Sequence, residues 1–394
     1  MYRVAIIVGT RPEAIKMAPV IKVLEQTPAV RPIVIATAQH RDMLDQVLSL
    51  FQIEPAHDLN LMSRNQNLGE LSGRLIESMF GVLSECNADY VLVHGDTTTT
   101  FLAALASYYQ KIPVGHVEAG LRTHRFYEPF PEEKNRQLTA AVTTLHFAPT
   151  VRAKRNLIAE GIADNSILVT GNTAVDAALM MSKQLDENFA AFKHDLAADI
   201  GSRSQEIFSQ ITGKQNLILL TVHRRESFDV GIFEICAAIE TLARAYPETL
   251  FVLPVHKNPN VYGPLHTKLG QLPNVALTEP LSYRSFVYLL RHARLVMTDS
   301  GGVQEEAPSF GIPVLVLRDV TERPEAVEAG LARVAGTSCT SIVGEARSVL
   351  DGSAAWLRTQ SENPYGDGKA AERIVARLLQ ELSSQQGYLV HDGG

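Results

Sequence analysis

Acidic side chains follow apolar runs in the first half of the chain. Asp96 lies two residues after a run at 90–94, and Glu118 directly follows another at 114–117. Glu132 begins a helical segment shortly afterwards. Clustered carboxylates raise one another's pKa, so that one can act as an acid while another acts as a base. The three positions therefore predict a proton-transfer site, although Asp96 as a helix N-cap and Glu132 as a partner of a helix dipole remain open.

The turn after the first apolar run has the features of an anion-binding helix start. Thr10 and Glu13 have capping-box spacing, and Pro12 suits a first helical turn. The N–H groups and the dipole at such a helix start favour an anion, and Arg11 and Lys16 add positive charge. The same residues also fit a well-capped helix whose basic side chains are merely solvated.

Basic residues follow an apolar run in the second half as well. The run at 217–221 is followed by Val222 and then by His223, Arg224 and Arg225. A histidine beside two arginines at the end of a strand suits a phosphate or a titrating site. A structural cluster of salt bridges is the alternative.

Residues 299–306, with the sequence DSGGVQEE, carry the most specific phosphate signal in the chain. Gly301 and Gly302 let the backbone approach a diphosphate, and Glu306, about one helical turn on, can accept hydrogen bonds from ribose hydroxyls. A purely structural turn between strand and helix is the alternative. The segment is not a P-loop, and no strand is followed by the Gly-x-Gly-x-x-Gly pattern of nicotinamide-binding domains.

The elements that must position these residues are short apolar strands alternating with amphipathic helical segments. We expect strands at 3–8, 32–37, 90–94, 114–117 and 146–149, and again at 217–221, 250–255, 275–278, 295–298 and 313–317. This alternation predicts parallel sheets covered by helices on both faces, with ligands beyond the carboxyl ends of the strands. The 394 residues are predicted to form two doubly wound α/β domains, at 1–170 and 171–364.

The composition excludes several classes of protein. Hydrophobic residues make up 45% of the chain and the net charge is −7, so we expect a globular protein with no nucleic-acid partner. Cys86, Cys236 and Cys339 are too far apart to indicate a disulfide framework or a zinc site. The first apolar run is too short for a signal peptide and no run is long enough to span a membrane. We therefore expect a cytoplasmic protein without membrane insertion.

Ten motifs between Gly9 and Gly368 together resemble the non-hydrolysing bacterial UDP-N-acetylglucosamine 2-epimerases. They are GTRPEAIKMAP, TAQHRDMLDQV, VHGDTTTT, GHVEAGLRT, PEEKNR, HRRESF, HKNPNV, DSGGVQEEAPSFG, TERPEAV and NPYGDG. The resemblance implies two Rossmann-like domains of the GT-B type with a cleft between them. It also implies a last helix at about 365–385 that crosses back onto the N-terminal domain, a homodimer, and a reaction without a nicotinamide or a metal.

The resemblance also implies a role for individual residues. The catalytic group would be Asp96, Glu118, Glu132 and His223. The UDP group would contact Arg11, Lys16, Ser300, Gly301, Gly302 and Arg323 at its diphosphate, Glu306 at its ribose and Phe286 at its uracil. A second UDP-N-acetylglucosamine, acting as an allosteric activator, would bind near Gln39, His40, Arg74 and Arg225.

The implied reaction inverts carbon 2 of UDP-N-acetylglucosamine to give UDP-N-acetylmannosamine. A base removes the proton on carbon 2 while UDP leaves, and UDP then adds back to the resulting 2-acetamidoglucal. Three alternatives remain: a 2-epimerase of a related UDP-diacetamido-uronic acid, a GT-B glycosyltransferase, and a nucleotide-sugar sensor without turnover. The sensor is disfavoured because all four proton-transfer residues are present.

Overall fold

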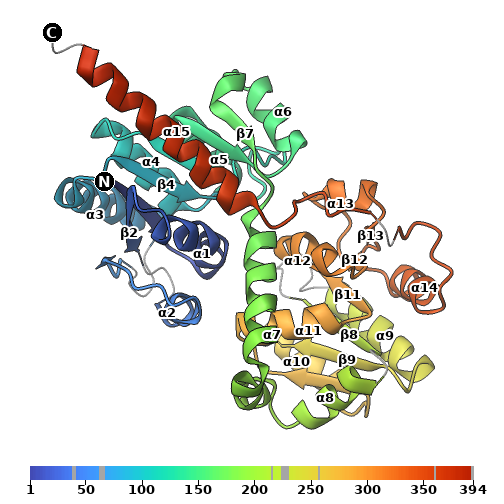
Figure 1. Ribbon diagram of the computed structural model, residues 1–394. Helices are drawn as coiled ribbons and strands as arrows, with labels where there is room; N and C mark the ends of the chain where they lie inside the picture. The colour runs from blue at the N-terminus through green and yellow to red at the C-terminus, as the bar shows by residue number, and fades with distance from the viewer. Residues whose placement is uncertain are drawn as a thin grey trace. The chain divides into compact units, whose positions relative to one another are not determined.

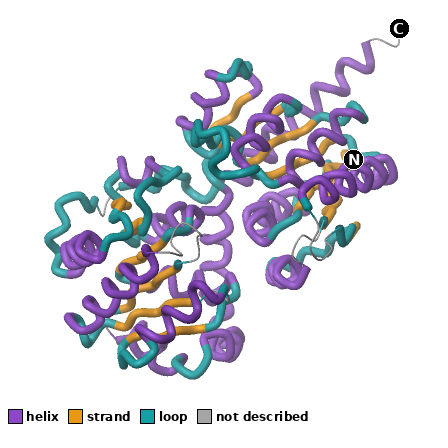
Figure 2. Tube along the Cα trace, turned by 180° about the vertical axis from the view of Figure 1, so that it is seen from behind, coloured by secondary structure: helices purple, strands orange, loops and turns teal. Residues whose placement is uncertain are grey.

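The computed structural model describes residues 1–37, 41–61, 67–213, 216–222, 230–255, 258–358 and 361–391. The chain divides into two compact units, which we call unit 1 (Met1–Ala177 with Gly366–Gly394) and unit 2 (Ala178–Tyr365). Each unit contains one parallel sheet with helices packed against it (Figures 1 and 2). The prediction of two α/β domains with parallel sheets is therefore confirmed.

Unit 1 has a seven-stranded sheet in the order β3-β2-β1-β4-β5-β6-β7. Its strands are β1 (Tyr2–Val8), β2 (Val30–Ala36), β3 (His57–Asp58), β4 (Tyr90–His94), β5 (Val114–Val117), β6 (Leu145–Ala148) and β7 (Ile167–Val169). The strand order reverses direction between β1 and β4. In doubly wound sheets this switch point is where ligands bind, so the loops that follow β1 and β4 are the first place to look for a site.

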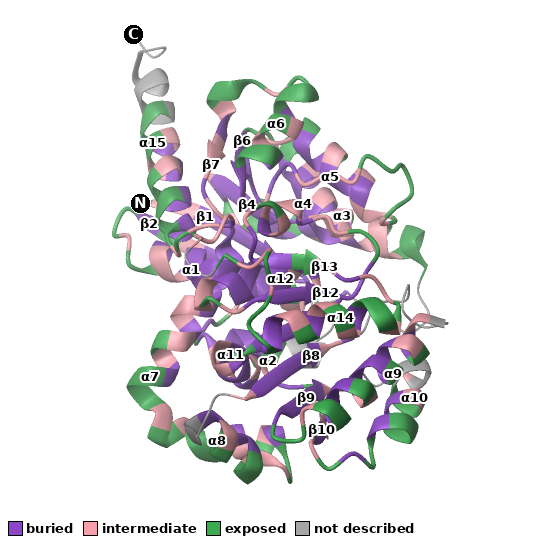
Figure 3. Ribbon diagram, turned by 90° about the vertical axis from the view of Figure 1, so that its right-hand side faces the viewer, coloured by how far each residue is buried: buried purple, intermediate pink, exposed green. Residues whose placement is uncertain are grey.

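The helices of unit 1 form two layers. Helices α3 (Leu68–Cys86), α4 (Thr98–Tyr109) and α5 (Glu132–Ala141) pack in one layer, and α1 (Arg11–Glu25), α2 (Arg41–Leu50) and α15 (Ala370–His391) pack in the other. Helix α6 (Val151–Ala159) packs against β6 and β7. Because both faces of the sheet are covered, β4, β5 and β6 are buried along their whole length, as Figure 3 shows for β4.

Unit 2 has a six-stranded sheet in the order β10-β9-β8-β11-β12-β13. Its strands are β8 (Leu217–Thr221), β9 (Leu250–Pro254), β10 (Val275–Thr278), β11 (Leu295–Thr298), β12 (Val314–Val316) and β13 (Ala332–Val334). Its helices are α8 (Ser204–Gly213), α9 (Val230–Ala245), α10 (Pro259–Leu269), α11 (Tyr283–His292), α12 (Gly301–Glu306), α13 (Pro324–Glu328) and α14 (Cys339–Leu350). The order reverses between β8 and β11, so the loop after β11 stands at the switch point of this sheet.

All ten predicted strands are present, within two residues at each end. The sequence missed β3, β7 and β13, which have only two or three residues each and lie at sheet edges. An apolar run that short leaves no periodic pattern to recognise.

The chain passes from unit 1 to unit 2 within helix α7 (Thr173–Ile200), a few residues after the predicted boundary at 170. The start of this helix belongs with the returning C-terminal segment. The Asp176 carboxylate accepts a hydrogen bond of 2.8 Å from the Ala371 backbone N–H, and Arg373 donates to the Thr170 carbonyl at 2.9 Å. Asp176 thus satisfies an N–H group at the start of α15, 195 residues further along the chain.

The described residues bear on the predictions about membrane-spanning segments and about the cysteines. In that part of the chain no helix is both long and apolar enough to span a bilayer. Cys86, Cys236 and Cys339 are free thiols.

Three histidines lie in the core of unit 1 on neighbouring strands. His94 ends β4, while His116 of β5 and His146 of β6 are register partners. Their side chains are at most 4% exposed. Burial lowers the pKa of His94 to about 4, that of His116 to about 3 and that of His146 to about 4. All three imidazoles are therefore neutral at pH 7.

We expect the free energy of unfolding to fall as the pH is lowered from about 6.5 towards 4. The folded-state pKa values lie below the unfolded value near 6.5, so this stabilisation is complete above pH 6.5 and is lost as the pH falls through the folded values. Each histidine contributes a slope of up to about 1.4 kcal/mol per pH unit. Denaturant titrations at several pH values measure this slope.

His146→Gln should reduce that slope by about the contribution of one histidine. His194→Gln is the control, since the His194 side chain is 94% exposed and should not affect the slope. An equal slope in wild type and His146→Gln would contradict the prediction.

Candidate functional site

Glu118 stands directly after β5 and is the most enclosed of the predicted catalytic carboxylates. Its φ of 64° places a non-glycine residue in the left-handed region, which turns the chain sharply at the strand end. Its side chain is 8% exposed and forms an ion pair with Lys16 of α1. Asn172 donates a hydrogen bond of 2.8 Å to the same carboxylate oxygen, and His94 Nε2 lies 3.8 Å from it.

The surroundings of Glu118 help to explain why the pKa of His94 is lowered. Burial is the main cause that lowers the His94 pKa, and the nearby Lys16 charge acts in the same direction, while Glu118 opposes both. A neutral imidazole beside a buried ion pair adds no further charge to the cluster. Neither ring nitrogen of His94 has a hydrogen-bond partner within the described part of the protein.

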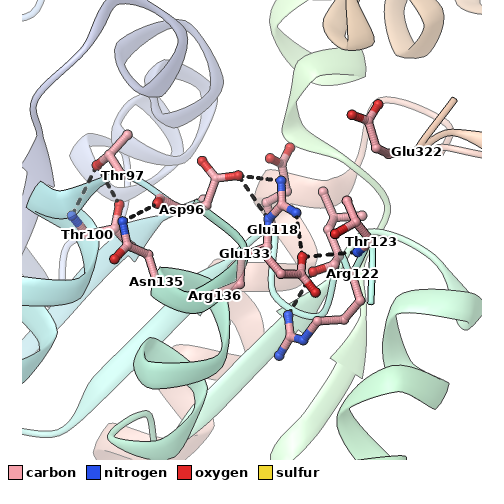
Figure 4. Close-up of polar contacts among 12 residues, drawn as sticks. Asp96, Thr97, Thr100, Glu118, Arg122, Thr123, Glu133, Asn135, Arg136 and Glu322 are labelled. Carbon is pink, nitrogen blue, oxygen red and sulfur yellow. Dashed lines mark hydrogen bonds and ion pairs between the residues drawn. The ribbon is translucent and has the colours of Figure 1, made fainter. Parts of the chain in front are cut away.

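Asp96 follows β4 at the switch point of the sheet and is paired with Arg136 of α5. The Asp96 carboxylate accepts hydrogen bonds of 2.6 and 2.9 Å from Arg136 Nη2 and Nε (Figure 4). Asn135 donates to the Asp96 carbonyl at 3.0 Å. The N-cap interpretation of Asp96 is wrong, because the Thr97 side chain caps α4 by accepting from the Thr100 N–H at 3.1 Å.

The structure separates the two glutamates at the start of α5. Glu133 is 1% exposed and accepts hydrogen bonds from the backbone N–H groups of Thr123 and His124, at 3.0 and 3.1 Å. It also pairs with Arg136 at 3.1 Å. Glu133 therefore holds the preceding loop in place, whereas Glu132 is only partly buried. Of the two, Glu132 is the one that remains accessible to a ligand.

The helix start after β1 has the predicted capping box. The Thr10 side chain accepts from the Glu13 N–H and the Glu13 carboxylate accepts from the Thr10 N–H, with Pro12 in the first turn. Arg11 is partly exposed at this helix start, as an anion-binding residue requires. Lys16 is buried and contacts Glu118, so its charge already compensates a carboxylate within unit 1.

In unit 2 the predicted phosphate residues lie at the junction of β11 and α12. Ser300 is the N-cap residue of α12, and its backbone N–H donates to Thr298 Oγ1 at 2.9 Å. A Cβ atom placed on Gly302 would meet no protein atom within 4 Å, so packing does not require glycine there. The absence of a side chain leaves the backbone N–H groups of this turn open to a ligand. Gly301 begins the helix beside it.

Glu306 and Phe286 come from neighbouring elements of unit 2. Glu306, at the end of α12, is 7% exposed, and Tyr283 Oη donates to its carboxylate at 3.5 Å. Phe286 lies on α11, one turn after Tyr283, and is partly buried. The structure thus brings the residues predicted for ribose and uracil onto α12 and α11 of the same unit.

Arg323 differs from a freely available cation. It is 8% exposed at the start of α13 and forms an ion pair with buried Glu305. Its backbone carbonyl accepts a hydrogen bond of 3.0 Å from Tyr365 Oη. These contacts hold Arg323 in place, and the Glu305 carboxylate compensates its positive charge.

Four predicted site residues, His223, Arg225, Gln39 and His40, lie outside the described residues. Arg74, predicted for the activator site, is partly buried on α3. Within the described ranges no group of three or more acidic, histidine or cysteine residues is arranged to hold a metal ion.

Sequence reasoning missed four residues that complete the carboxylate cluster: His94, Glu133, Arg136 and Asn172. A signal for Arg136 was present, because Glu132, Glu133 and Arg136 lie three or four residues apart at the start of one helix. The sequence holds no comparable signal for Asn172, which lies 54 residues beyond Glu118.

Comparisons with known proteins agree on one family. A family model described as UDP-N-acetylglucosamine 2-epimerase matches residues 22–379. A protein of Ralstonia nicotianae named "Probable UDP-N-acetylglucosamine 2-epimerase" is 48% identical over 379 residues, covering 96% of this chain and 99% of its own. The UDP-N-acetylglucosamine 2-epimerase of Escherichia coli strain K12 is 48% identical over 377 residues, covering 95% and 98%.

Solved structures agree with the sequence relatives. The crystal structure of UDP-GlcNAc 2-epimerase from Neisseria meningitidis, bound to UDP-GlcNAc, matches with a TM-score of 0.87 at 47% identity. The match covers 96% of this chain and 100% of that one.

Replacing Lys16 should destabilise unit 1. Lys16→Met leaves the Glu118 carboxylate buried without its cation, and breaking a buried pair in this way costs about 3–5 kcal/mol. Adding Glu118→Gln to this variant should restore part of the loss, because the unpaired charge is then removed. Chemical denaturation of the two single variants and the double variant measures the coupling between the two residues.

Lys22→Met on the same helix is the matched control. Its partner Glu25 is 40% exposed, so losing this pair should cost no more than about 1 kcal/mol. Equal losses of stability for Lys16→Met and Lys22→Met would contradict the importance of the buried pair.

Proposed function

This chain belongs to the UDP-N-acetylglucosamine 2-epimerase family, and we propose that it inverts carbon 2 of UDP-N-acetylglucosamine by eliminating UDP and adding it back. It is an enzyme of the isomerase class, and the product is UDP-N-acetylmannosamine. The observation that carries the mechanism is the convergence of Asp96 and Glu118 beside the switch point of unit 1, each held by a cation. A group that must transfer a proton has to be held in one orientation, and ion pairs provide this.

The proposed reaction needs a base, an acid and stabilisation of the departing diphosphate. A base takes the proton from carbon 2 while the bond from the anomeric carbon to UDP breaks, which gives 2-acetamidoglucal. UDP then adds back to the anomeric carbon while carbon 2 receives a proton on the opposite face. We propose Asp96, Glu118, Glu132 and His223 as the proton-transfer group, with no single base assigned, because interacting carboxylates titrate together.

The residues proposed for the UDP group follow from the helix starts of the two units. In unit 1, Arg11 offers a cation at the start of α1, and the Lys16 charge lies one turn further along. In unit 2, Ser300, Gly301 and Gly302 offer an open turn for phosphate. Glu306 is proposed for the ribose, Phe286 for the uracil and Arg323 for the diphosphate.

Several finer expectations stay predictions: a homodimer, activation by a second UDP-N-acetylglucosamine, the cytoplasmic location and the cleft between the domains. Three of the four residues predicted for the activator site lie outside the described ranges. The boundaries of the predicted domains are likewise retained as a proposal.

The mechanism predicts that product formed in heavy water carries deuterium at carbon 2. Elimination loses the original hydrogen to a side chain, and the proton that returns has exchanged with solvent. Incubation of the protein with UDP-N-acetylglucosamine alone, followed by separation and proton NMR, measures both the product and its label. Because no acceptor is supplied, a glycosyltransferase would form no UDP-N-acetylmannosamine.

Product that keeps its original hydrogen at carbon 2, at long as well as short reaction times, would contradict elimination. If UDP-N-acetylglucosamine is not turned over at all, the substrate assignment is wrong. A UDP-diacetamido-uronic acid then becomes the substrate to assay.

Replacing the proposed proton-transfer residues should reduce turnover. Asp96→Asn, Glu118→Gln, Glu132→Gln and His223→Ala should each lower kcat by about 10²- to 10⁴-fold, the usual cost of losing a general acid or base. In Asp96→Asn and Glu118→Gln a neutral amide also replaces the ion-pair partner of a buried cation, so these two variants should lose stability as well as turnover. Steady-state kinetics with thermal unfolding of each variant separates the two effects.

The matched control is Glu372→Gln, an exposed glutamate on α15, which should keep wild-type kcat. A Glu132→Gln variant with wild-type kcat would remove Glu132 from the proposed group.

A further inference from the structure

The carboxylate of Glu13 contacts more than its own helix start. Its Oε2 atom accepts hydrogen bonds from the backbone N–H groups of Gly9 and Thr10, at 2.8 and 2.7 Å, and from Thr10 Oγ1 at 3.0 Å. These three donors belong to Gly9 and Thr10, in the segment 9–11 between β1 and α1. We call this segment the Arg11 loop, because Arg11 ends it as the first residue of α1. One oxygen of Glu13 therefore organises the loop that we propose for anion binding.

The other oxygen of Glu13 reaches the loop after β4. Thr97 Oγ1 donates to Glu13 Oε1 at 2.6 Å, and the Thr100 hydroxyl, which donates to the His94 carbonyl, lies 3.1 Å from the same Glu13 oxygen. Thr97 is the residue next to Asp96 and is also the N-cap of α4. Glu13 thus connects the loop of Arg11 to the loop of Asp96, across the switch point between β1 and β4.

The connection is buried at Glu13 itself and partly buried at Thr10 and Thr97. Glu13 is only 3% exposed. A Cβ atom on Gly9 would come within 2.7 Å of Thr37 Oγ1 and 2.8 Å of Thr99 Oγ1, and these two hydroxyls lie 3.3 Å apart. Neither loop can shift without disturbing this polar layer, because closely packed groups have no free volume to move into.

Helix capping by itself does not require a buried glutamate, as α3 demonstrates. Asn67 and Glu70 form the same reciprocal capping box at the start of α3, with hydrogen bonds of 3.0 and 3.2 Å, and Glu70 is exposed. Burying a carboxylate is unfavourable unless donors compensate it, and Glu13 accepts from four: the backbone N–H groups of Gly9 and Thr10 and the hydroxyls of Thr10 and Thr97. The burial of Glu13 is therefore explained by its contacts with the second loop.

We propose that Glu13 is a positioning residue that sets the distance between the Arg11 loop and the Asp96 loop for the epimerisation. This proposal rests on the proposed function. Lys16 lies one turn after Glu13 on the same helix and contacts Glu118, so one helix start aligns two of the three predicted catalytic carboxylates, Asp96 and Glu118. Glu13 acts on the reaction only through the residues that it holds.

The test compares Glu13→Ala, Glu13→Gln and Glu70→Ala. We expect Glu13→Ala to lower kcat by about 10²-fold, since a displacement of about 1 Å at a reacting group has that effect. Glu13→Gln should keep kcat within about tenfold of wild type, because its carbonyl oxygen can still accept from Gly9 and Thr10. Glu70→Ala loses a capping box of the same kind and should keep wild-type kcat and KM.

Amide hydrogen exchange provides a readout that does not depend on activity. In Glu13→Ala, exchange should rise in both loops, residues 9–11 and 95–100, and in Glu70→Ala it should rise at the start of α3 alone. If the wild-type protein does not epimerise UDP-N-acetylglucosamine, the proposed function fails while the exchange result still decides whether Glu13 connects the loops. Exchange confined to residues 9–11 in Glu13→Ala would overturn the proposal.

Variants of Thr97 test the connection from its other end, and keep the proposal testable if Glu13→Ala does not fold. Thr97→Val removes the hydroxyl that donates to Glu13 and should lower kcat by about tenfold. Thr97→Ser keeps this hydroxyl and should retain most of the wild-type kcat. Thr139→Val is the control, because the buried Thr139 hydroxyl has no hydrogen-bond partner among the described residues. Equal kcat for Thr97→Val and wild type would overturn the proposal.

Discussion

The ion pair between Lys16 and Glu118 is the interaction on which the candidate site of unit 1 depends. It joins the start of α1 to the end of β5, and both side chains are almost completely buried. A buried carboxylate without a partner is strongly unfavourable, and Lys16 supplies Glu118 with a cationic partner at this strand end. The neutral His94 and the amide of Asn172 fit the same requirement, since they surround Glu118 without adding charge.

The carboxylates around Asp96 are likewise compensated by a buried cation. Arg136 donates to Asp96 and to Glu133, so one guanidinium compensates two carboxylates that arise from different elements. Glu133 in turn holds the backbone of the loop before α5. The site is therefore a set of carboxylates that are each held by a buried cation, with Glu132 partly exposed beside them.

Unit 2 also has a parallel sheet with a switch point, but a glycine turn follows the strand there. Its switch point carries an open glycine turn at Gly302, and its buried arginines are paired within the unit, Arg323 with Glu305 and Arg318 with Glu322. The backbone N–H groups of the turn after β11 are therefore the groups that we propose as its anion donors. Unit 1 presents fixed carboxylates suited to proton transfer, and unit 2 presents a turn suited to a phosphate.

The sequence by itself determined the parallel strands, the two α/β units, the capping box of Thr10 and Glu13, and the positions of Asp96 and Glu118 within two residues of strand ends. These features depend on residues close together in the chain, where periodicity and helix-start spacing are visible. Only the tertiary structure decided that Arg136 pairs with Asp96, that Asn172 contacts Glu118, that Glu133 rather than Glu132 is buried, and that Glu13 reaches Thr97. Those contacts join residues that the order of the strands and the packing of helices on the sheet bring together. The sequence around either residue does not indicate which distant residue it will contact.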